Sequence, residues 1–272
     1  MRGLIGRLFS ARARKEAQGV ALVLSGGGAR AWAHIGLLKA LEEENIQIKA
    51  ISGVSAGSIV GALYAKGHTA DEILEIVQKT DMFKILRKGI FSLASGAFSS
   101  LNHLRQQLEI FLPEDSFEAL GKKLFVSAVN LNTGKLEIFD SGDLHKPIMA
   151  SCAVPLLFLP VKMGEYLYAD GGILNNLPVE PLLGHGYKII GSNVVSPVPN
   201  MQLGGFRSVS MRSFELVSYK GIEAQTRQCD VVLTYEGLER YNIFHFAAAR
   251  EIVELGYRSA RKQMDILLTR LK

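Results

Sequence analysis

A serine flanked by glycines is the first feature of this sequence that could do chemistry. Gly53, Ser55 and Gly57 form a Gly-x-Ser-x-Gly pattern between an expected strand over 47–54 and a small-residue helix reaching Ala65. In such a turn, the small neighbours let the backbone fold back and expose the serine hydroxyl above the helix N-terminus, where free amides favour an anionic intermediate. The pattern predicts a nucleophilic serine for acyl transfer, although it also occurs by chance in small-residue helices.

An aspartate is the best candidate for the base that this serine requires. Asp170 follows an alternating segment over 165–169 and precedes two glycines, so we expect its carboxylate at a strand end on a tight turn. A carboxylate beside the serine can accept its proton directly. The usual base is histidine, but none of the six histidines stands in a motif typical of catalysis: His34, His68, His103, His145, His185 and His245. An ordinary Asp-Gly turn is the alternative interpretation of Asp170.

A glycine run supplies a third candidate element. Gly26, Gly27 and Gly28 follow an apolar run and precede Arg30 and a helical pattern. Backbone amides at a helix N-terminus can hold an oxyanion or a phosphate. The run also matches a dinucleotide fingerprint formally, but no Asp or Glu stands about 20 residues later, and the Gly-Lys-Ser/Thr of a P-loop is absent. We therefore expect an oxyanion loop rather than a nucleotide site.

The elements that must position these residues alternate along the chain. Beyond strands over 20–24 and 47–54, we expect strands over 123–129, 135–139, 187–195 and 230–234, and helices over 33–44, 70–79, 101–111, 144–151, 206–225 and 245–270. Thr69 and Glu72 form a capping box for the helix over 70–79. The alternation predicts an α/β fold, with a mainly parallel central sheet and helices on both faces. Residues 87–100 lack periodicity, and we expect a mobile loop there that can act as a lid.

The composition indicates one folded domain. The 272 residues are 48% hydrophobic and 21% charged, which is typical of a globular protein. Because no repeat or linker divides the chain, we expect a basic segment over 1–18 and a single domain over 19–272. Two cysteines, Cys152 and Cys229, can build neither a disulfide framework nor a four-ligand zinc site, and they fit a reducing compartment. We expect neither a metal nor a cofactor.

The positive charge is concentrated at the N-terminus. The net charge is +5, and residues 1–16 hold five basic residues and one glutamate. An excess confined to one terminal segment does not form a surface for nucleic acid, so we expect no such partner. No apolar stretch is long enough to span a bilayer, and Arg7 and Arg12 interrupt any signal-peptide core. We therefore expect a cytoplasmic protein or one that lies on the inner membrane face.

Both ends of the chain carry apolar stripes. The first comprises Met1, Leu4, Ile5, Leu8 and Phe9. With the nearby arginines it predicts an interfacial helix that contacts a membrane; a frayed end or packing on another subunit is the alternative. The second comprises Val253, Tyr257, Ala260, Met264, Leu267 and Leu271. Such a C-terminal stripe packs on its own domain or joins two copies in a homo-oligomer.

Four segments resemble a known family. They read LVLSGGGARAWAHIGLLKAL, GVSAGSIVGALYA, ASCAVPLLFLPV and YADGGILNNLPV, within about residues 19–195. In this order and spacing they resemble the patatin-like phospholipases. The resemblance implies a metal-free Ser-Asp dyad hydrolase of lipid acyl esters, with Ser55 as nucleophile, Asp170 as its partner, and Gly26, Gly27, Gly28 and Arg30 as the oxyanion loop. The alanine at position 31, where the family usually has glycine, is the one visible departure.

The expected function is therefore that of a serine acyl hydrolase, of the phospholipase A or lysophospholipase type, in a compact bacterial form. Its substrate partner would be a lipid or another acyl ester. Phe158 and Leu159 are candidates to line an acyl-chain pocket, within a segment that otherwise forms a buried passage from helix to strand. Two alternatives stay open: a Ser-His-Asp esterase that uses His185 or His245, and a non-catalytic lipid-binding regulatory or scaffold protein on the same fold.

Overall fold

A computed structural model describes residues 19–80, 101–195 and 204–272 of the chain. The expectations for the basic segment over 1–16 and for a lid over 87–100 fall on residues outside these ranges. The strands are β1 Val20–Leu24, β2 Ile48–Val54, β3 Lys123–Asn130, β4 Lys135–Phe139, β5 Val161–Met163, β6 Tyr166–Asp170, β7 Lys188–Asn193 and β8 Val231–Thr234. The helices are α1 Ala33–Glu43, α2 Ala56–Lys66, α3 Ala70–Lys79, α5 Asn102–Phe111, α6 His145–Ser151, α7 Gly205–Tyr219, α8 Ile222–Thr226, α9 Ala249–Lys262 and α10 Met264–Leu271.

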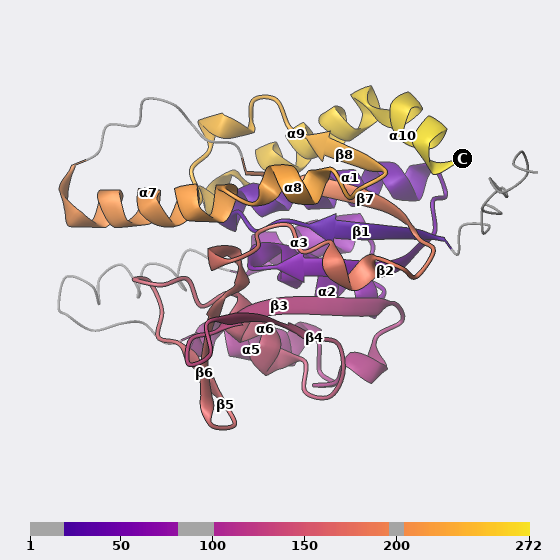
Figure 1. Ribbon diagram of the computed structural model, residues 1–272. Coiled ribbons are helices and arrows are strands. Elements are labelled where there is room, and N and C mark those ends of the chain that lie inside the picture. The colour runs from indigo at the N-terminus through magenta and orange to yellow at the C-terminus, as the bar shows by residue number, and fades with distance from the viewer. Residues whose placement is uncertain (1–18, 81–100, 196–203) are drawn as a thin grey trace, which may run out of the picture.

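One mixed sheet occupies the centre of the molecule, with helices around it (Figure 1). Hydrogen-bonded neighbours run β5-β6-β3-β2-β1-β7-β8, and β4 pairs with β3 as well. Strands β1, β2, β3, β7 and β8 are parallel, whereas β4, β5 and β6 join antiparallel beyond β3. The predicted α/β fold with a mainly parallel sheet is confirmed. Because β1 has β2 on one side and β7 on the other, the strand order reverses there, which is where α/β proteins place their sites.

The central strand is buried on both faces. Along β1, Ala21 and Val23 face one apolar cluster, which includes Ile222 of α8, while Leu22 and Leu24 face the larger core beneath α1 and α2. All four of these side chains are fully buried. A parallel strand covered on both sides needs such a continuous apolar run, which is why residues 20–24 form a strand.

Local signals place most elements within a few residues of their predicted bounds. The capping box of α3 is present, with the Thr69 hydroxyl accepting from the Glu72 amide and the Glu72 carboxylate accepting from the Thr69 amide. Two predicted helices are each divided. The helix expected over 206–225 breaks at Gly221, and the one over 245–270 starts as a 3-10 turn and breaks at Gln263. Glycine is a poor helix former, which accounts for the first break.

The C-terminal apolar stripe packs within the chain. Its members Val253, Ala260, Met264 and Leu267 are buried, and α9 lies directly against α1. The approach is close because Gly36 of α1 faces the backbone of α9 and Gly256 of α9 faces the backbone of α1. A Cβ at Gly256 would collide with the carbonyl oxygen of Ala33. The stripe is therefore part of the core of a single chain.

The α1–α9 contact leads to a prediction about stability. Gly256→Ala is expected to lower the free energy of unfolding by about 3 kcal/mol, because an added methyl in a closely packed contact forces the helices apart. Gly221→Ala serves as the control, since a Cβ there meets no atom within 4 Å, and it should change stability by less than about 1 kcal/mol. Urea denaturation followed by circular dichroism measures both; equal effects would contradict the close-contact explanation.

Candidate active site

Ser55 sits in the tight turn between β2 and α2, as the sequence predicted. It has a φ of 53°, a strained conformation for any residue except glycine. Glycine is required at both neighbouring positions because a side chain would not fit there. A Cβ at Gly57 would lie 2.5 Å from the carbonyl oxygen of Leu24, and one at Gly53 would lie 2.9 Å from that of Gly57. The turn thus forces α2 against the end of β1 and leaves the serine side chain at its apex.

Hydrogen bonds hold the backbone of Ser55 on both sides. Its amide donates to Ser151 Oγ at 2.8 Å, and its carbonyl oxygen accepts from the Ser58 amide at 2.9 Å and from the Ser58 hydroxyl at 2.7 Å. These bonds offset the strain of the positive φ. The residue is therefore fixed in the backbone while its side chain faces the pocket.

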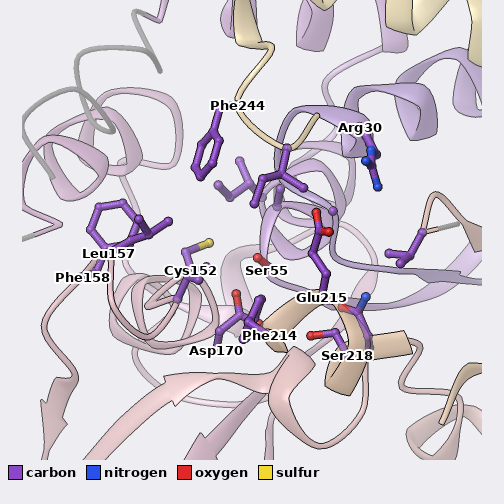
Figure 2. A pocket seen from close by; sticks show the side chains of 18 of the residues that line it. Arg30, Ser55, Cys152, Leu157, Phe158, Asp170, Phe214, Glu215, Ser218 and Phe244 are labelled. Atoms are coloured by element: carbon purple, nitrogen blue, oxygen red, sulfur yellow. The ribbon is translucent and has the colours of Figure 1, made fainter. Parts of the chain in front are cut away.

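The register of β3 brings Asp170 to Ser55. Val54 is paired with Ser127, and Asp170 with the next residue, Ala128. The residues of β3 that pair with β4 overlap both those that pair with β2 and those that pair with β6. β4 therefore lies along one edge of β3, and β2 and β6 share the other edge, where they meet end to end. Gly171 permits this meeting, because a Cβ there would lie 2.6 Å from the Ser127 carbonyl oxygen. Figure 2 shows the Ser55 and Asp170 side chains close together at the base of a pocket.

The Asp170 carboxylate is buried and only partly hydrogen-bonded. It is 1% exposed, and Oδ1 accepts from the Gly172 amide at 2.8 Å. No described group lies in hydrogen-bond geometry with Oδ2. Burial raises the pKa of Asp170 from 3.8 to about 7, against the opposing effects of the Ser55 hydroxyl and the Gly172 amide. A carboxyl group with this pKa can exchange a proton near neutral pH.

The glycine loop lies directly beside Ser55. The Gly26 amide donates to Asn176 Oδ1 at 3.2 Å, and a Cβ at Gly26 would lie 3.0 Å from Ser55 Cβ. The Ala29 amide donates to the Ile243 carbonyl oxygen at 2.9 Å. Among the residues that the structure describes, no group accepts a hydrogen bond from the amides of Gly27 and Gly28, and both glycines line the pocket.

Arg30 anchors the glycine loop through its side chain. The guanidinium Nε donates to the Tyr241 carbonyl oxygen at 2.6 Å, and the side chain is buried at the edge of the pocket. Burial lowers the pKa of Arg30, while the carboxylate of Glu215 acts in the opposite direction. Arginine remains charged in proteins, so Arg30 brings a fixed positive charge to the edge of the pocket, while Glu215 is ion-paired with Arg212 at 3.3 Å.

A buried polar network fixes the start of the loop from below. His34 Nε2 lies 2.9 Å from the Ser25 carbonyl oxygen, and Nδ1 lies 2.7 Å from Ser192 Oγ. Because a carbonyl only accepts, Nε2 carries the proton and Nδ1 accepts from Ser192, whose oxygen in turn accepts from the Tyr235 hydroxyl. Burial lowers the pKa of His34 to about 4, which keeps the ring neutral at pH 7. The Ser25–Gly26 peptide is thus held by His34 at one end and Asn176 at the other.

Ser55 and Asp170 open into a pocket with two unlike sides. Its empty volume, including the mouth, is about 910 Å³. Figure 2 shows Leu157, Phe158 and Phe244 on one side and the charged Arg30 and Glu215 on the other. Of the two residues proposed for an acyl pocket, Phe158 lines it, whereas Leu159 is 49% exposed and lies outside the lining.

The histidines lie elsewhere, and no metal cluster accompanies the pocket. All six histidines are described, and none lines it. His185 stacks on Tyr187, and His245 hydrogen-bonds with Asn242.

Outside the three undescribed segments, His, Cys, Asp and Glu side chains form no group that could hold a metal. Both cysteines are free. In the described ranges, no helix has the length and apolar character needed to cross a membrane.

Several residues that shape the site were not predicted from the sequence. Ser151 and Asn176 lie inside the family-like segments, which is the only sequence signal that could have pointed to them. Ser192 and Tyr235 stand at the ends of strands without any motif. Each makes its decisive contact with a residue distant in the chain, so local patterns could not assign its role.

The fold and the site together define an α/β protein with a nucleophile-elbow serine next to a buried aspartate and a glycine loop. The chain belongs to the patatin-like phospholipase family, whose model matches residues 22–183. An uncharacterised NTE family protein of Mycobacterium bovis is 34% identical over 165 residues, which are 61% of this chain and 46% of that protein. The lysophospholipase NTE1 of Kluyveromyces lactis is 27% identical over 271 residues, covering 88% of this chain and 19% of that protein.

A solved structure is similar in fold. ExoU, from the type III secretion system of Pseudomonas aeruginosa in complex with SpcU, superposes with a TM-score of 0.50 at 17% identity, over 95% of this chain and 54% of ExoU. At this identity the likeness concerns the fold alone. The chain spans less than half the length of the two curated relatives, so their full architectures include parts without a counterpart here.

The buried network under the glycine loop leads to a second prediction. Ser192→Ala should lower the free energy of unfolding at pH 7 by about 3 kcal/mol, because it leaves both the His34 ring nitrogen and the Tyr235 hydroxyl buried without partners. Tyr235→Phe removes a single terminal hydroxyl and keeps the Ser192–His34 bond, so about 1 kcal/mol is expected. Urea unfolding compares the two variants; a larger loss for Tyr235→Phe would show that the proposed donor order is wrong.

Proposed function

We propose that this protein hydrolyses acyl esters of lipids, as a phospholipase A or lysophospholipase, with Ser55 as nucleophile and Asp170 as general base. The observation that carries the proposal is the pairing of a strained, pocket-facing serine with a buried aspartate whose pKa is about 7. Enzymes commonly tune an acid or base to the working pH in this way. The name of the Kluyveromyces relative, a lysophospholipase, supports the same reaction.

The proposed reaction has two stages. Asp170 accepts the Ser55 proton as Oγ attacks the ester carbonyl carbon, and the negative charge moves to the carbonyl oxygen. The amides of Gly27 and Gly28 are the proposed donors to this oxyanion, while Gly26 and Arg30 hold the loop in shape. The C–O bond then breaks, and the leaving alcohol takes the proton from Asp170. Water, deprotonated by Asp170, attacks the acyl-enzyme. The bond between the acyl carbon and Oγ then breaks, Oγ takes the proton back from Asp170, and the fatty acid is released.

The two sides of the pocket support a lipid as the substrate. An acyl chain gains free energy by entering the apolar side, at about 0.8 kcal/mol per buried methylene. The opposite side presents Arg30 and Glu215, which suit the polar part of an amphipathic ester. A purely apolar or purely charged pocket would favour other substrates.

The two alternatives from the sequence have less support. A Ser-His-Asp esterase needs a histidine within hydrogen-bond reach of the serine, and the pocket lining holds no histidine. A non-catalytic lipid-binding protein needs neither the strained Ser55 nor the unfavourable burial of Asp170. Retention of both features supports an enzyme.

Membrane contact and location remain proposals from the sequence. The basic residues within 1–16 would attract an anionic lipid surface by about 1 kcal/mol each, which suits an enzyme acting at the inner membrane face. Association of two copies through the C-terminal stripe has less support, because the stripe is buried within one chain.

The dyad leads to a third prediction. Ser55→Ala and Asp170→Asn should each lower kcat for p-nitrophenyl butyrate by about 10⁴-fold or more, because the two groups act as a unit. His185→Asn and His245→Asn are the controls and should retain wild-type turnover. Loss of activity in a folded His185 or His245 variant would instead establish the Ser-His-Asp esterase.

The raised pKa of Asp170 leads to a fourth prediction. Only the carboxylate form can take the serine proton, so kcat/KM should fall as pH drops below about 7 and level off above it. The folded-state pKa exceeds the ordinary 3.8, so ionisation of Asp170 lowers stability as pH rises from about 4 to about 7. Asp170→Asn should therefore gain stability over the wild type across this window in urea titrations. A pH-independent difference between the two proteins would contradict the assignment.

A further inference from the structure

A second hollow lies next to the active-site pocket. We call it the distal cavity; α2, α3 and α5 line it, with Trp32 alongside, and its empty volume, including its opening to solvent, is about 350 Å³. Ile59 and Leu104 line both the distal cavity and the active-site pocket. These two apolar side chains therefore form a wall that the two spaces share.

The lining of the distal cavity is suited to hydrocarbon. It includes Leu63, Val77, Leu108 and Phe111 and contains no charged residue. Thr80 and Gln107 are hydrogen-bonded to each other at 3.4 Å, and the indole Nε1 of Trp32 is a buried donor with no partner among the described residues. The rest of the lining is apolar, and the cavity presents no charge that would exclude an alkyl chain.

Helix α2 leads from the nucleophile to this cavity. Ser55, Ile59 and Leu63 are spaced four residues apart and lie along one face of the helix. At 1.5 Å per residue, Ile59 and Leu63 lie about 6 Å and about 12 Å beyond Ser55 along the axis. An extended chain advances about 1.2 Å per bond, so an acyl chain of about ten carbons held at Ser55 reaches the level of Leu63.

We propose that the distal cavity binds the methyl end of a long acyl chain, so that this enzyme is specific for long-chain rather than short-chain lipid esters. The proposal rests on the hydrolase function proposed above, because it needs the ester carbonyl at Ser55. The carboxyl-proximal part of the chain occupies the active-site pocket, and the remainder passes between Ile59 and Leu104. Each methylene that enters the distal cavity raises kcat/KM by about fourfold, equivalent to about 0.8 kcal/mol.

Two substitutions on α5 test this specificity. Leu108 is 3% exposed and lines the distal cavity, whereas Ile110, two residues later, is 62% exposed. Leu108→Phe fills the cavity, and Ile110→Phe is the matched control. The kcat/KM ratio of p-nitrophenyl palmitate to p-nitrophenyl butyrate should fall by at least about tenfold in Leu108→Phe and stay at the wild-type value in Ile110→Phe. An unchanged ratio in Leu108→Phe would overturn the proposal.

The wild-type protein offers a test that does not depend on activity. Trp32 is the single tryptophan of the chain, is 1% exposed and lines the distal cavity. Bromine quenches indole fluorescence at contact distance. ω-Bromohexadecanoic acid should quench Trp32 strongly and ω-bromobutanoic acid weakly, because a four-carbon chain held at Ser55 ends before Ile59 and only the longer acid carries its bromine into the distal cavity. Leu108→Phe should reduce the quenching by the long acid, and Ile110→Phe should not.

The outcomes separate the two proposals. Trp32 also packs edge-on against Phe246, a residue of the active-site pocket, with ring centroids 5.9 Å apart. An acid bound in that pocket alone can therefore quench part of the fluorescence, so the decisive measurement is the difference in quenching between the two acids. Equal quenching by both acids overturns the long-chain subsite even if butyrate is hydrolysed, in which case the hydrolase function stands alone. Length-dependent quenching without any ester hydrolysis confirms the subsite and refutes the hydrolase function.

Discussion

The meeting of β2 and β6 on one edge of β3 is the constraint on which the site depends. Neighbouring residues of β3 pair with Val54 and Asp170, so two chain segments more than 100 residues apart end side by side. Glycine is needed at this junction because any side chain at Gly171 would strike the β3 backbone. Without this register the serine turn would form, but its carboxylate partner would be absent.

The junction of β2 and β6 also buries the Asp170 carboxyl group where its negative charge is unfavourable. Asp170 is enclosed almost completely, and a single backbone amide is a weak substitute for water, so its charged form is disfavoured and its pKa rises to about 7. By contrast, the backbone on both sides of it is held by hydrogen bonds: Ser151 accepts from the Ser55 amide, and Asn176 accepts from the Gly26 amide. An electrostatically unfavourable group held in place by such bonds is typical of a catalytic site.

The pocket beyond Ser55 has two chemically different sides. Apolar side chains lie on one side and the charged Arg30 and Glu215 on the other, and α2 runs from Ser55 past Ile59 to Leu63, which lines the distal cavity. One helix thus carries the proposed nucleophile at its start and contributes side chains to both hollows along its length. The relatives extend well beyond the region they share with this chain, and the family model matches residues 22–183.

The sequence alone determined what depends on local backbone geometry. The serine turn, the aspartate at a strand end and the glycine loop are each specified by residues a few positions apart, because glycine and small side chains set the allowed backbone there. The tertiary structure decided which amides stay free and what holds the loop, since those hydrogen bonds join residues 96, 150 and 158 positions apart. Such pairs leave no periodic pattern in the sequence; they arise only when strands from distant segments adopt one register in the sheet.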